Sequence, residues 1–208
     1  MNYNKAKKFL KSNISEDHKI DRVLGMLDQE ARDLLLKLKN NKNIQGKICN
    51  TYDDIKVEEI KINLSELDVY YSKKLYEQLN KCKKRYKIIY VIIKFTKGRH
   101  INILLVDNKK KTVERFDTFD EFTKHKEKII KVILNKLNIK YKFINPTNYI
   151  FSSKRKDCGL CVPLSFLYIY LKIYYDLKLD EVINLLSGLT NLNLFSISSW
   201  FVNYLNDE

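Results

Sequence analysis

Residues 87–117 read KIIYVIIKFTKGRHINILLVDNKKKTVERFD, and this stretch decides the fold class. Three runs rich in β-branched and aromatic residues follow one another in it, which predicts three neighbouring strands of one sheet. Their bounds are Lys87–Thr96, His100–Asp107 and Thr112–Asp117. The segment Asp107–Lys109 between the last two runs is rich in turn-forming residues, so we expect these two strands to form a hairpin.

Segments with helical periodicity lie on both sides of the predicted sheet. Before it they cover about residues 1–12, 19–39 and 65–81, and Ser65 and Asp68 open the last one in a spacing that resembles a capping box. After it they cover 120–137, 161–177, 180–186 and 194–205, with a short strand at Lys140–Ile144. Helices, then strands, then helices predict an α+β domain with a central mixed sheet flanked by helices.

The 208 residues fit one globular domain. We expect residues 1–85 to form a mostly helical region that packs on a catalytic core of residues 86–208. The stretch 161–177 is nearly all apolar, so it predicts the buried central helix of that core.

The composition excludes a disordered chain, because hydrophobic residues make up 45% and only two prolines and five glycines are present. The first residues are polar and lysine-rich, and no stretch reaches the roughly 18 apolar residues of a membrane span. We therefore expect a soluble intracellular protein without membrane contact. In that compartment the four cysteines are expected to be reduced, namely Cys49, Cys82, Cys158 and Cys161.

The segment Asp157–Cys161 directly precedes the apolar helix and carries two thiols. A cysteine protease needs a thiolate, a histidine that takes and returns its proton, and an acceptor that orients the imidazole. A helix N-terminus lowers the pKa of a thiol, because its unpaired N–H groups and its dipole favour the thiolate. Cys158 and Cys161 are therefore both candidate nucleophiles.

His100 opens one predicted strand and Asp117 closes the next, so the hairpin brings these two residues toward each other. A carboxylate beside an imidazole can hold it by its second nitrogen. Each residue alone is better explained as a strand end or a helix entry. Only their combination with a cysteine at a helix start indicates a catalytic triad.

The segments HINILLVD at 100–107 and KTVERFD at 111–117 resemble the ubiquitin-like-protease superfamily of cysteine proteases. In that superfamily a histidine, a hydrophobic strand, a turn, a second strand and an acidic residue follow in this order. The segment Glu114–Asp117 and the segment GLCVPLSFLY at 159–168 are most similar to the processing proteases of large DNA viruses. The resemblance covers about residues 87–178 and implies a papain-like fold with the nucleophile at the N-terminus of a buried helix.

The two cysteines correspond to two registers of this resemblance. The register of the viral proteases makes Cys161 the nucleophile, whereas the Asp-Cys-Gly motif of the de-SUMOylating enzymes and the adenoviral protease makes it Cys158. A helix that started at Cys158 would have Pro163 in its second turn, at a cost of roughly 3 kcal/mol. A helix that starts at Cys161 has Pro163 in its first turn, where the missing N–H is harmless. We favour Cys161, with Cys158 as the alternative.

The superfamily commonly uses a glutamine side chain as an oxyanion donor, and no glutamine lies between Asp117 and the cysteines. Asn148 and Ser152 are the candidate replacements. Ile101 also departs from the family, which often has an aromatic residue after the histidine. Loss of one donor typically lowers the rate 10²- to 10³-fold, so a catalytically inactive relative is a second interpretation.

The resemblance implies a cysteine protease that hydrolyses peptide or isopeptide bonds after small residues such as glycine. Its protein substrate would be a viral precursor or a conjugate of a ubiquitin-like modifier. We also expect a monomer without a cofactor. On the viral interpretation the protein would act in the host cytoplasm, in a virus factory or in the virion.

A different class of function follows from the net charge of +14, which arises from 39 Lys and Arg against 25 Asp and Glu. Such a surplus attracts polyanions, so nucleic acid is a candidate accessory partner. A basic nucleic-acid-binding protein without catalysis is the alternative function, and Lys81–Lys87 and Lys154–Lys156 are its best patches.

The spacing of Cys158 and Cys161 is also that of half a zinc site. The remaining cysteines, Cys49 and Cys82, do not have the matching spacing of a second pair. We therefore expect no metal.

Overall fold

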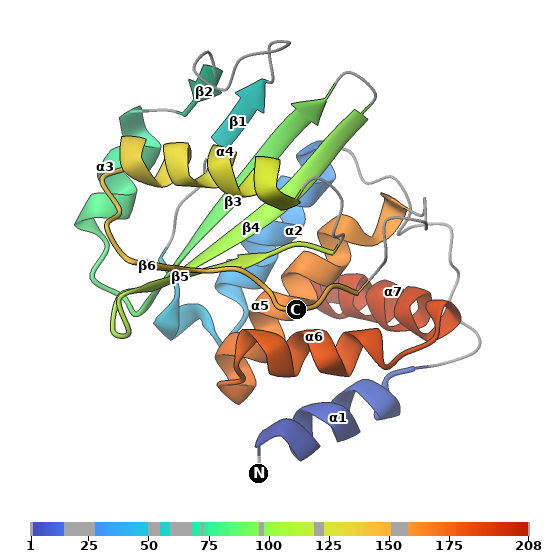
Figure 1. The fold of residues 1–208 in the computed structure, drawn as a ribbon. Helices are drawn as coiled ribbons and strands as arrows, with labels where there is room; N and C mark the ends of the chain where they lie inside the picture. Colours follow the sequence, from blue (N-terminus) through green and yellow to red (C-terminus); the bar gives the residue numbers. More distant parts are fainter. Residues whose placement is uncertain are drawn as a thin grey trace.

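The computed structural model describes residues 2–14, 28–49, 55–58, 68–71, 73–95, 98–118, 123–150 and 158–207. Its centre is a six-stranded mixed sheet with the strand order β2-β1-β3-β4-β5-β6 (Figure 1). The strands are β1 (Ile55–Glu58), β2 (Asp68–Tyr70), β3 (Tyr86–Phe95), β4 (Gly98–Asp107), β5 (Thr112–Phe116) and β6 (Lys142–Ile144). The pairs β1–β3 and β5–β6 are parallel and the other pairs are antiparallel.

Helices cover both faces of this sheet (Figure 1). They are α1 (Asn2–Ser12), α2 (Asp28–Asn40), α3 (Lys73–Lys81), α4 (Thr123–Lys136), α5 (Cys161–Tyr175), α6 (Leu179–Ser187) and α7 (Asn191–Asp207). Short 3₁₀ helices lie at η2 (Gln45–Lys47) and η4 (Cys158–Leu160). The predicted α+β class and the central mixed sheet are confirmed.

Side chains alternate between two apolar clusters because successive residues of a strand point to opposite faces of a sheet. On β4, Ile103 and Leu105 belong to the cluster that α1, α2, α5, α6 and α7 cover. Leu104 and Val106 belong to the cluster that α3 and α4 cover. The near-continuous apolar sequence of β4 is therefore explained by burial on both faces.

The predicted hairpin between β4 and β5 is confirmed, with Asp107 opposite Thr112 and Ile103 opposite Phe116. One carboxylate oxygen of Asp107 accepts hydrogen bonds from the backbone N–H groups of Lys109 and Lys110 at 2.9 and 3.0 Å. Lys111 completes the turn in the left-handed region, at a φ of 54°. The turn is thus built by local chemistry, as the Asp107–Lys109 sequence predicts.

The long apolar stretch forms α5, whose residues from Cys161 to Ile173 are all buried. This helix packs on β4 of the sheet and against α1, α2, α6 and α7. It is the buried central helix that the sequence predicts. No helix in the described ranges is both long enough and apolar enough to cross a bilayer.

The helix predicted for residues 65–81 is wrong in its first part. Asp68 lies in β2 opposite Glu58, and the helix α3 begins only at Lys73. Val69 and Tyr70 favour a strand, and pairing with β1 outweighs the capping-box spacing. Ser65 and residues 19–27 lie outside the described residues. Both β1 and β2 precede residue 85 and are strands of the same sheet as the predicted core.

The expectation that all four cysteines are reduced is also wrong, because Cys49 and Cys82 form a disulfide. The backbone N–H of Cys49 donates a hydrogen bond to the carbonyl of Tyr86 at 2.9 Å, which places Cys49 beside the start of β3. Cys82 precedes β3 by four residues, and the Cα atoms of the two cysteines are 6.0 Å apart. Their separation of 33 positions in the sequence carries no signal for this pairing.

Candidate active site

The head of α5 is the first part of the candidate site. The α-helix begins at Cys161, and the 3₁₀ turn η4 begins three residues earlier, at Cys158. Pro163 therefore lies in the first turn of α5, where a backbone N–H has no partner in the helix in any case. The predicted helix start at Cys161 is confirmed.

Cys161 takes no part in a disulfide between described residues, and its side chain belongs to the apolar cluster on the α5 face of the sheet. Only 8% of the residue is exposed. Its backbone carbonyl accepts a hydrogen bond of 2.6 Å from the Ser165 hydroxyl, one turn later in the helix. Access from solvent to the Cys161 thiol is therefore narrow.

His100 lies in the β4–β5 hairpin, and Asp117 directly follows it. The register of the hairpin ends with Ile103 opposite Phe116, and Asp117 is the next residue after β5. His100 lies three residues before Ile103 in β4, and its side chain lies outside what the structure describes. The approach of His100 to Asp117 therefore stays a prediction.

Asp117 has a partner that the sequence interpretation missed. It forms an ion pair with the guanidinium of Arg115, and both side chains are fully buried. Arg115 also donates a hydrogen bond of 3.4 Å to the side-chain oxygen of Asn145, which follows β6. The two residues are separated by one position in an extended segment and so share a face, which is the sequence signal that could have found this pair.

Glu114 lies on the other face of β5 and connects this strand to α5. Its carboxylate accepts hydrogen bonds from the Lys172 ammonium at 2.8 Å and from the Tyr168 hydroxyl at 3.0 Å. Burial, followed by the Glu114 charge, raises the pKa of Tyr168 well above its ordinary value. The ring of Phe116 stacks on Tyr168 with 4.4 Å between centroids. These contacts fix β5, which leads to Asp117, against the helix whose head carries the cysteines.

Of the two candidate oxyanion donors, Asn148 lies within the described part of the chain. Asn148 is exposed and lies in the segment after β6, two residues beyond Pro146. In the same segment, the Thr147 hydroxyl donates a hydrogen bond of 2.9 Å to Asp180 of α6, which anchors the segment to the helical layer. Ser152 and Asp157 lie outside the described residues.

The positions of the cysteines bear on the hypothesis of a zinc site. The two cysteines that a second zinc pair would need, Cys49 and Cys82, are bonded to each other. Among the described residues, no group of three or more His, Cys, Asp and Glu side chains gathers around a point that a metal ion would occupy.

No family model matches the sequence, and no curated protein matches it. Among solved structures, the SUMO protease Ulp1 with its catalytic cysteine oxidized to a sulfenic acid is 12% identical over 98% of this chain and 93% of that chain, with a TM-score of 0.46. The Legionella pneumophila effector protein RavZ is 13% identical over 90% of this chain and 67% of its own, with a TM-score of 0.48. The Chlamydia trachomatis effector protein Cdu1, bound to ubiquitin, is 8% identical over 99% and 90%, with a TM-score of 0.46.

Proposed function

We propose that this chain is a cysteine protease of the ubiquitin-like-protease superfamily that hydrolyses peptide or isopeptide bonds after small residues such as glycine. Its thiolate comes from the head of α5, its base is His100, and its orienting carboxylate is Asp117. The observation that supports the proposal is the start of α5 at Cys161, which puts a thiol at the N-terminus of a buried helix that packs on β4, the strand of His100.

Two cysteines at the head of α5 are candidates for the nucleophile. The start of the α-helix at Cys161, with Pro163 in its first turn, supports Cys161, which the sequence favours. The 8% exposure of Cys161 within an apolar cluster supports the alternative, Cys158, because a substrate carbonyl must reach the sulfur. Cys158 opens η4, one 3₁₀ turn before α5.

The reaction follows the general scheme of thiol proteases. The imidazole of His100 takes the proton of the thiol, and the thiolate attacks the scissile carbonyl carbon. The amine leaves with the proton that His100 returns, and an acyl-enzyme remains at the cysteine sulfur. A water molecule, deprotonated by the same imidazole, then hydrolyses the thioester and restores the thiol.

The oxyanion of each tetrahedral intermediate needs hydrogen-bond donors at the head of the helix. Backbone N–H groups of the first helical turn point toward this position, although Pro163 supplies none. A side-chain donor is therefore needed more than in a helix without the proline, and Asn148 and Ser152 remain the candidates.

Arg115 gives Asp117 its fixed position in this scheme. A buried carboxylate that pairs with a guanidinium is restricted to few orientations, and here one terminal nitrogen of Arg115 donates to one oxygen of Asp117. Asp117 can then orient the imidazole of His100 without reorganising during the reaction. Arg115 acts through Asp117 and is a positioning residue.

Two substrate classes fit this chemistry, namely viral precursor proteins and conjugates of ubiquitin-like modifiers. Both would present an extended segment of small, glycine-type residues, which can reach a thiol through a narrow approach. The similarity of Glu114–Asp117 to the viral processing proteases favours the viral class.

The test is covalent labelling with a peptide that ends in a glycine electrophile. We expect the native chain to be labelled on one cysteine of the α5 head, and His100→Ala to abolish labelling near neutral pH. Cys161→Ser and Cys158→Ser identify the nucleophile, since only the variant of the nucleophile loses the label. Cleavage of the corresponding glycine-ended amide substrate by the native chain distinguishes the protease from an inactive relative. Labelling that survives all three substitutions would eliminate the protease.

A further inference from the structure

The ends of four neighbouring strands lie in one row, on the side of the sheet that is remote from His100. Tyr86 opens β3 opposite Asp107 at the end of β4, Asp107 lies opposite Thr112 at the start of β5, and Thr112 lies beside Lys142 at the start of β6. Adjacent strands are about 4.8 Å apart, so the row is about 14 Å wide. Three chain segments meet there, namely 81–87, 107–112 and 138–143.

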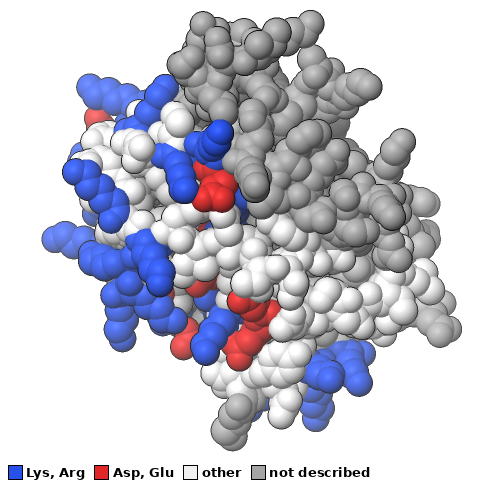
Figure 2. Space-filling model, in the orientation of Figure 1, with Lys and Arg blue, Asp and Glu red and all other residues white. Residues whose placement is uncertain are grey.

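These three segments carry eight exposed lysines, which are Lys81, Lys83, Lys84, Lys109, Lys110, Lys111, Lys140 and Lys142. We call this set the lysine edge. Figure 2 shows Lys and Arg side chains gathered over this end of the sheet. The one carboxylate within the three segments is Asp107, whose side chain is 5% exposed and paired with Arg85. Carboxylates of the same segments therefore do not neutralise the lysines.

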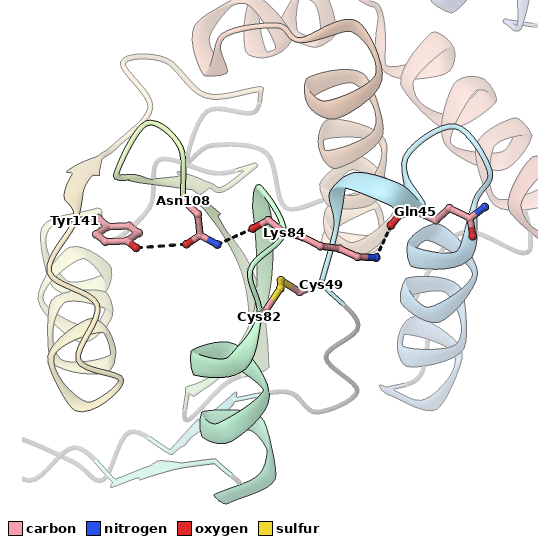
Figure 3. The surroundings of a disulfide bond; sticks show 6 residues. All are labelled: Gln45, Cys49, Cys82, Lys84, Asn108 and Tyr141. Carbon is pink, nitrogen blue, oxygen red and sulfur yellow. Dashed lines mark hydrogen bonds between the residues drawn. A yellow bond between two sulfur atoms is a disulfide. The ribbon is translucent and has the colours of Figure 1, made fainter.

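Side-chain contacts fix the three segments against one another (Figure 3). The Tyr141 hydroxyl donates to the Asn108 side chain at 3.4 Å, and the Asn108 amide donates to the carbonyl of Lys84 at 2.7 Å. The Lys84 ammonium donates to the carbonyl of Gln45 at 2.9 Å. The Cys49–Cys82 disulfide joins the same region covalently. The lysine edge is thus built on a fixed frame rather than on independent loops.

Lys87, a buried lysine at the start of β3, lies within the electrostatic range of Lys111 of the lysine edge. Its pKa is lowered mainly by burial, an effect that Tyr141 partly offsets and to which Lys111 adds. Like charges that lie near one another gain free energy when an anion binds between them, because the anion relieves their repulsion. The lysine edge therefore favours a polyanion as its ligand.

We propose that the lysine edge binds the phosphate backbone of a nucleic acid. Lysines are compact point charges that suit phosphates without reading a base sequence, so this binding is independent of nucleotide sequence. A row of about 14 Å spans several phosphates of a duplex, which carries one charge per about 1.7 Å of its axis. A membrane surface fits less well, since stable interfacial binding adds inserted apolar residues and the exposed large hydrophobic residues of the described chain, Leu36, Tyr174 and Leu192, lie in other segments.

The lysine edge lies far from the proposed catalytic residues. His100 and Asp107 are seven positions apart along β4, which corresponds to about 24 Å of extended chain. A nucleic acid bound at Lys109–Lys111 therefore leaves the head of α5 open to a protein substrate. The binding concentrates the protein on nucleic acid and is separable from the chemistry.

The test compares two quadruple variants with equal net charge. The first changes Lys83, Lys109, Lys110 and Lys140 to Gln, and the second, the control, changes the exposed lysines Lys5, Lys7, Lys8 and Lys11 of α1 to Gln. The titrants are a labelled duplex of about 30 base pairs, a single strand of the same length, and acidic phospholipid vesicles, each at about 50 mM and about 200 mM salt.

We expect the first variant to bind both nucleic acids at least about 10-fold more weakly than the native chain at the higher salt concentration, with a shallower salt dependence. The control should remain within about 3-fold, and both variants should keep the native melting temperature and the native labelling by the glycine probe. If both variants bound nucleic acid equally weakly, the affinity would depend on net charge alone, and the proposal would be overturned. So would binding to vesicles but not to nucleic acid. Neither result depends on whether the chain is a protease.

Discussion

Arg115 and Asp117 lie on the same side of β5 and its continuation, and their charged groups form an ion pair with both side chains fully buried. Desolvation of two charges is expensive, and their attraction repays it only when the geometry is good and further hydrogen bonds are made. Arg115 makes one such bond to Asn145. The pair therefore serves geometry more than stability, and it fixes the carboxylate that we assign to the triad.

Replacement of Arg115 by Leu should lower the free energy of unfolding by about 3–5 kcal/mol, because the buried carboxylate of Asp117 loses its cationic partner. Urea denaturation measures this loss. Arg85→Leu is the control, because the Arg85 guanidinium is partly exposed and pairs with Asp107 at 3.2 Å. Its effect should be less than half as large. If the two substitutions lowered the free energy of unfolding equally, burial of the Arg115–Asp117 pair would have no measurable effect on stability.

Arg115→Lys separates positioning from folding. The ammonium keeps the positive charge but lacks the planar fork, so we expect a folded protein whose reaction with the glycine electrophile is slower. Labelling of the Lys variant at the native rate, with native stability, would remove Arg115 from the role of positioning residue.

Lys172→Met should destabilise the protein by about 3–5 kcal/mol, because Glu114 loses its buried cationic partner at 2.8 Å. The double variant Glu114→Gln, Lys172→Met should recover at least half of this loss, since both charges are then absent. Lys131→Met is the matched control, because its ion pair with Glu127 is largely exposed, and it should change stability by no more than about 0.5 kcal/mol. Similar losses in Lys172→Met and Lys131→Met would contradict the buried network.

The β4–β5 hairpin and the start of α5 could be predicted from the sequence because short-range chemistry determines them. Asp107 accepts hydrogen bonds from the N–H groups two and three residues later, and Pro163 favours a helix start at Cys161 over one at Cys158. The fold class followed from the order of such segments.

The features that the sequence did not reveal arise from contacts between distant segments. Cys49 lies close to Cys82 only because the chain after η2 runs beside β3, where the backbone N–H of Cys49 donates a hydrogen bond to the carbonyl of Tyr86. Asp68 lies in a strand because β1 is available as a partner, which outweighs the local helical spacing. Lone strands of three or four residues carry little periodicity, so β1 and β2 could not be located from pattern alone.

Stability should decrease above about pH 10. Burial raises the pKa values of Tyr86, Tyr168, Tyr170 and Tyr175 in the folded chain, whereas an unfolded tyrosine titrates near pH 10. Above that pH the unfolded state releases protons that the folded state keeps, so the unfolded state is favoured. Stability from these groups is complete below about pH 10 and declines as the pH rises toward their folded pKa values. Urea midpoints at about pH 9, pH 10 and pH 11 measure the decline.

Tyr86→Phe tests one of these groups. Within the described part of the chain the buried Tyr86 hydroxyl has no hydrogen-bond partner, so its removal should stabilise the protein by about 1 kcal/mol near neutral pH. The variant should also lose less stability between about pH 9 and pH 11 than the native chain. A destabilised Tyr86→Phe variant with the native pH profile would contradict this assignment.

The Cys49–Cys82 disulfide should be visible as a difference in thiol count. Alkylation of the denatured chain without reductant should modify only Cys158 and Cys161, whereas alkylation after reduction should modify all four cysteines. The double variant Cys49→Ser, Cys82→Ser should lose up to about 4 kcal/mol of stability, because the bond closes a loop of 33 residues in the unfolded chain. The same variant tests the frame of the lysine edge, since Cys82 directly precedes Lys83 and Lys84. We expect weaker nucleic-acid binding with unchanged glycine-probe labelling, and four reactive thiols in the unreduced native chain would refute the bond.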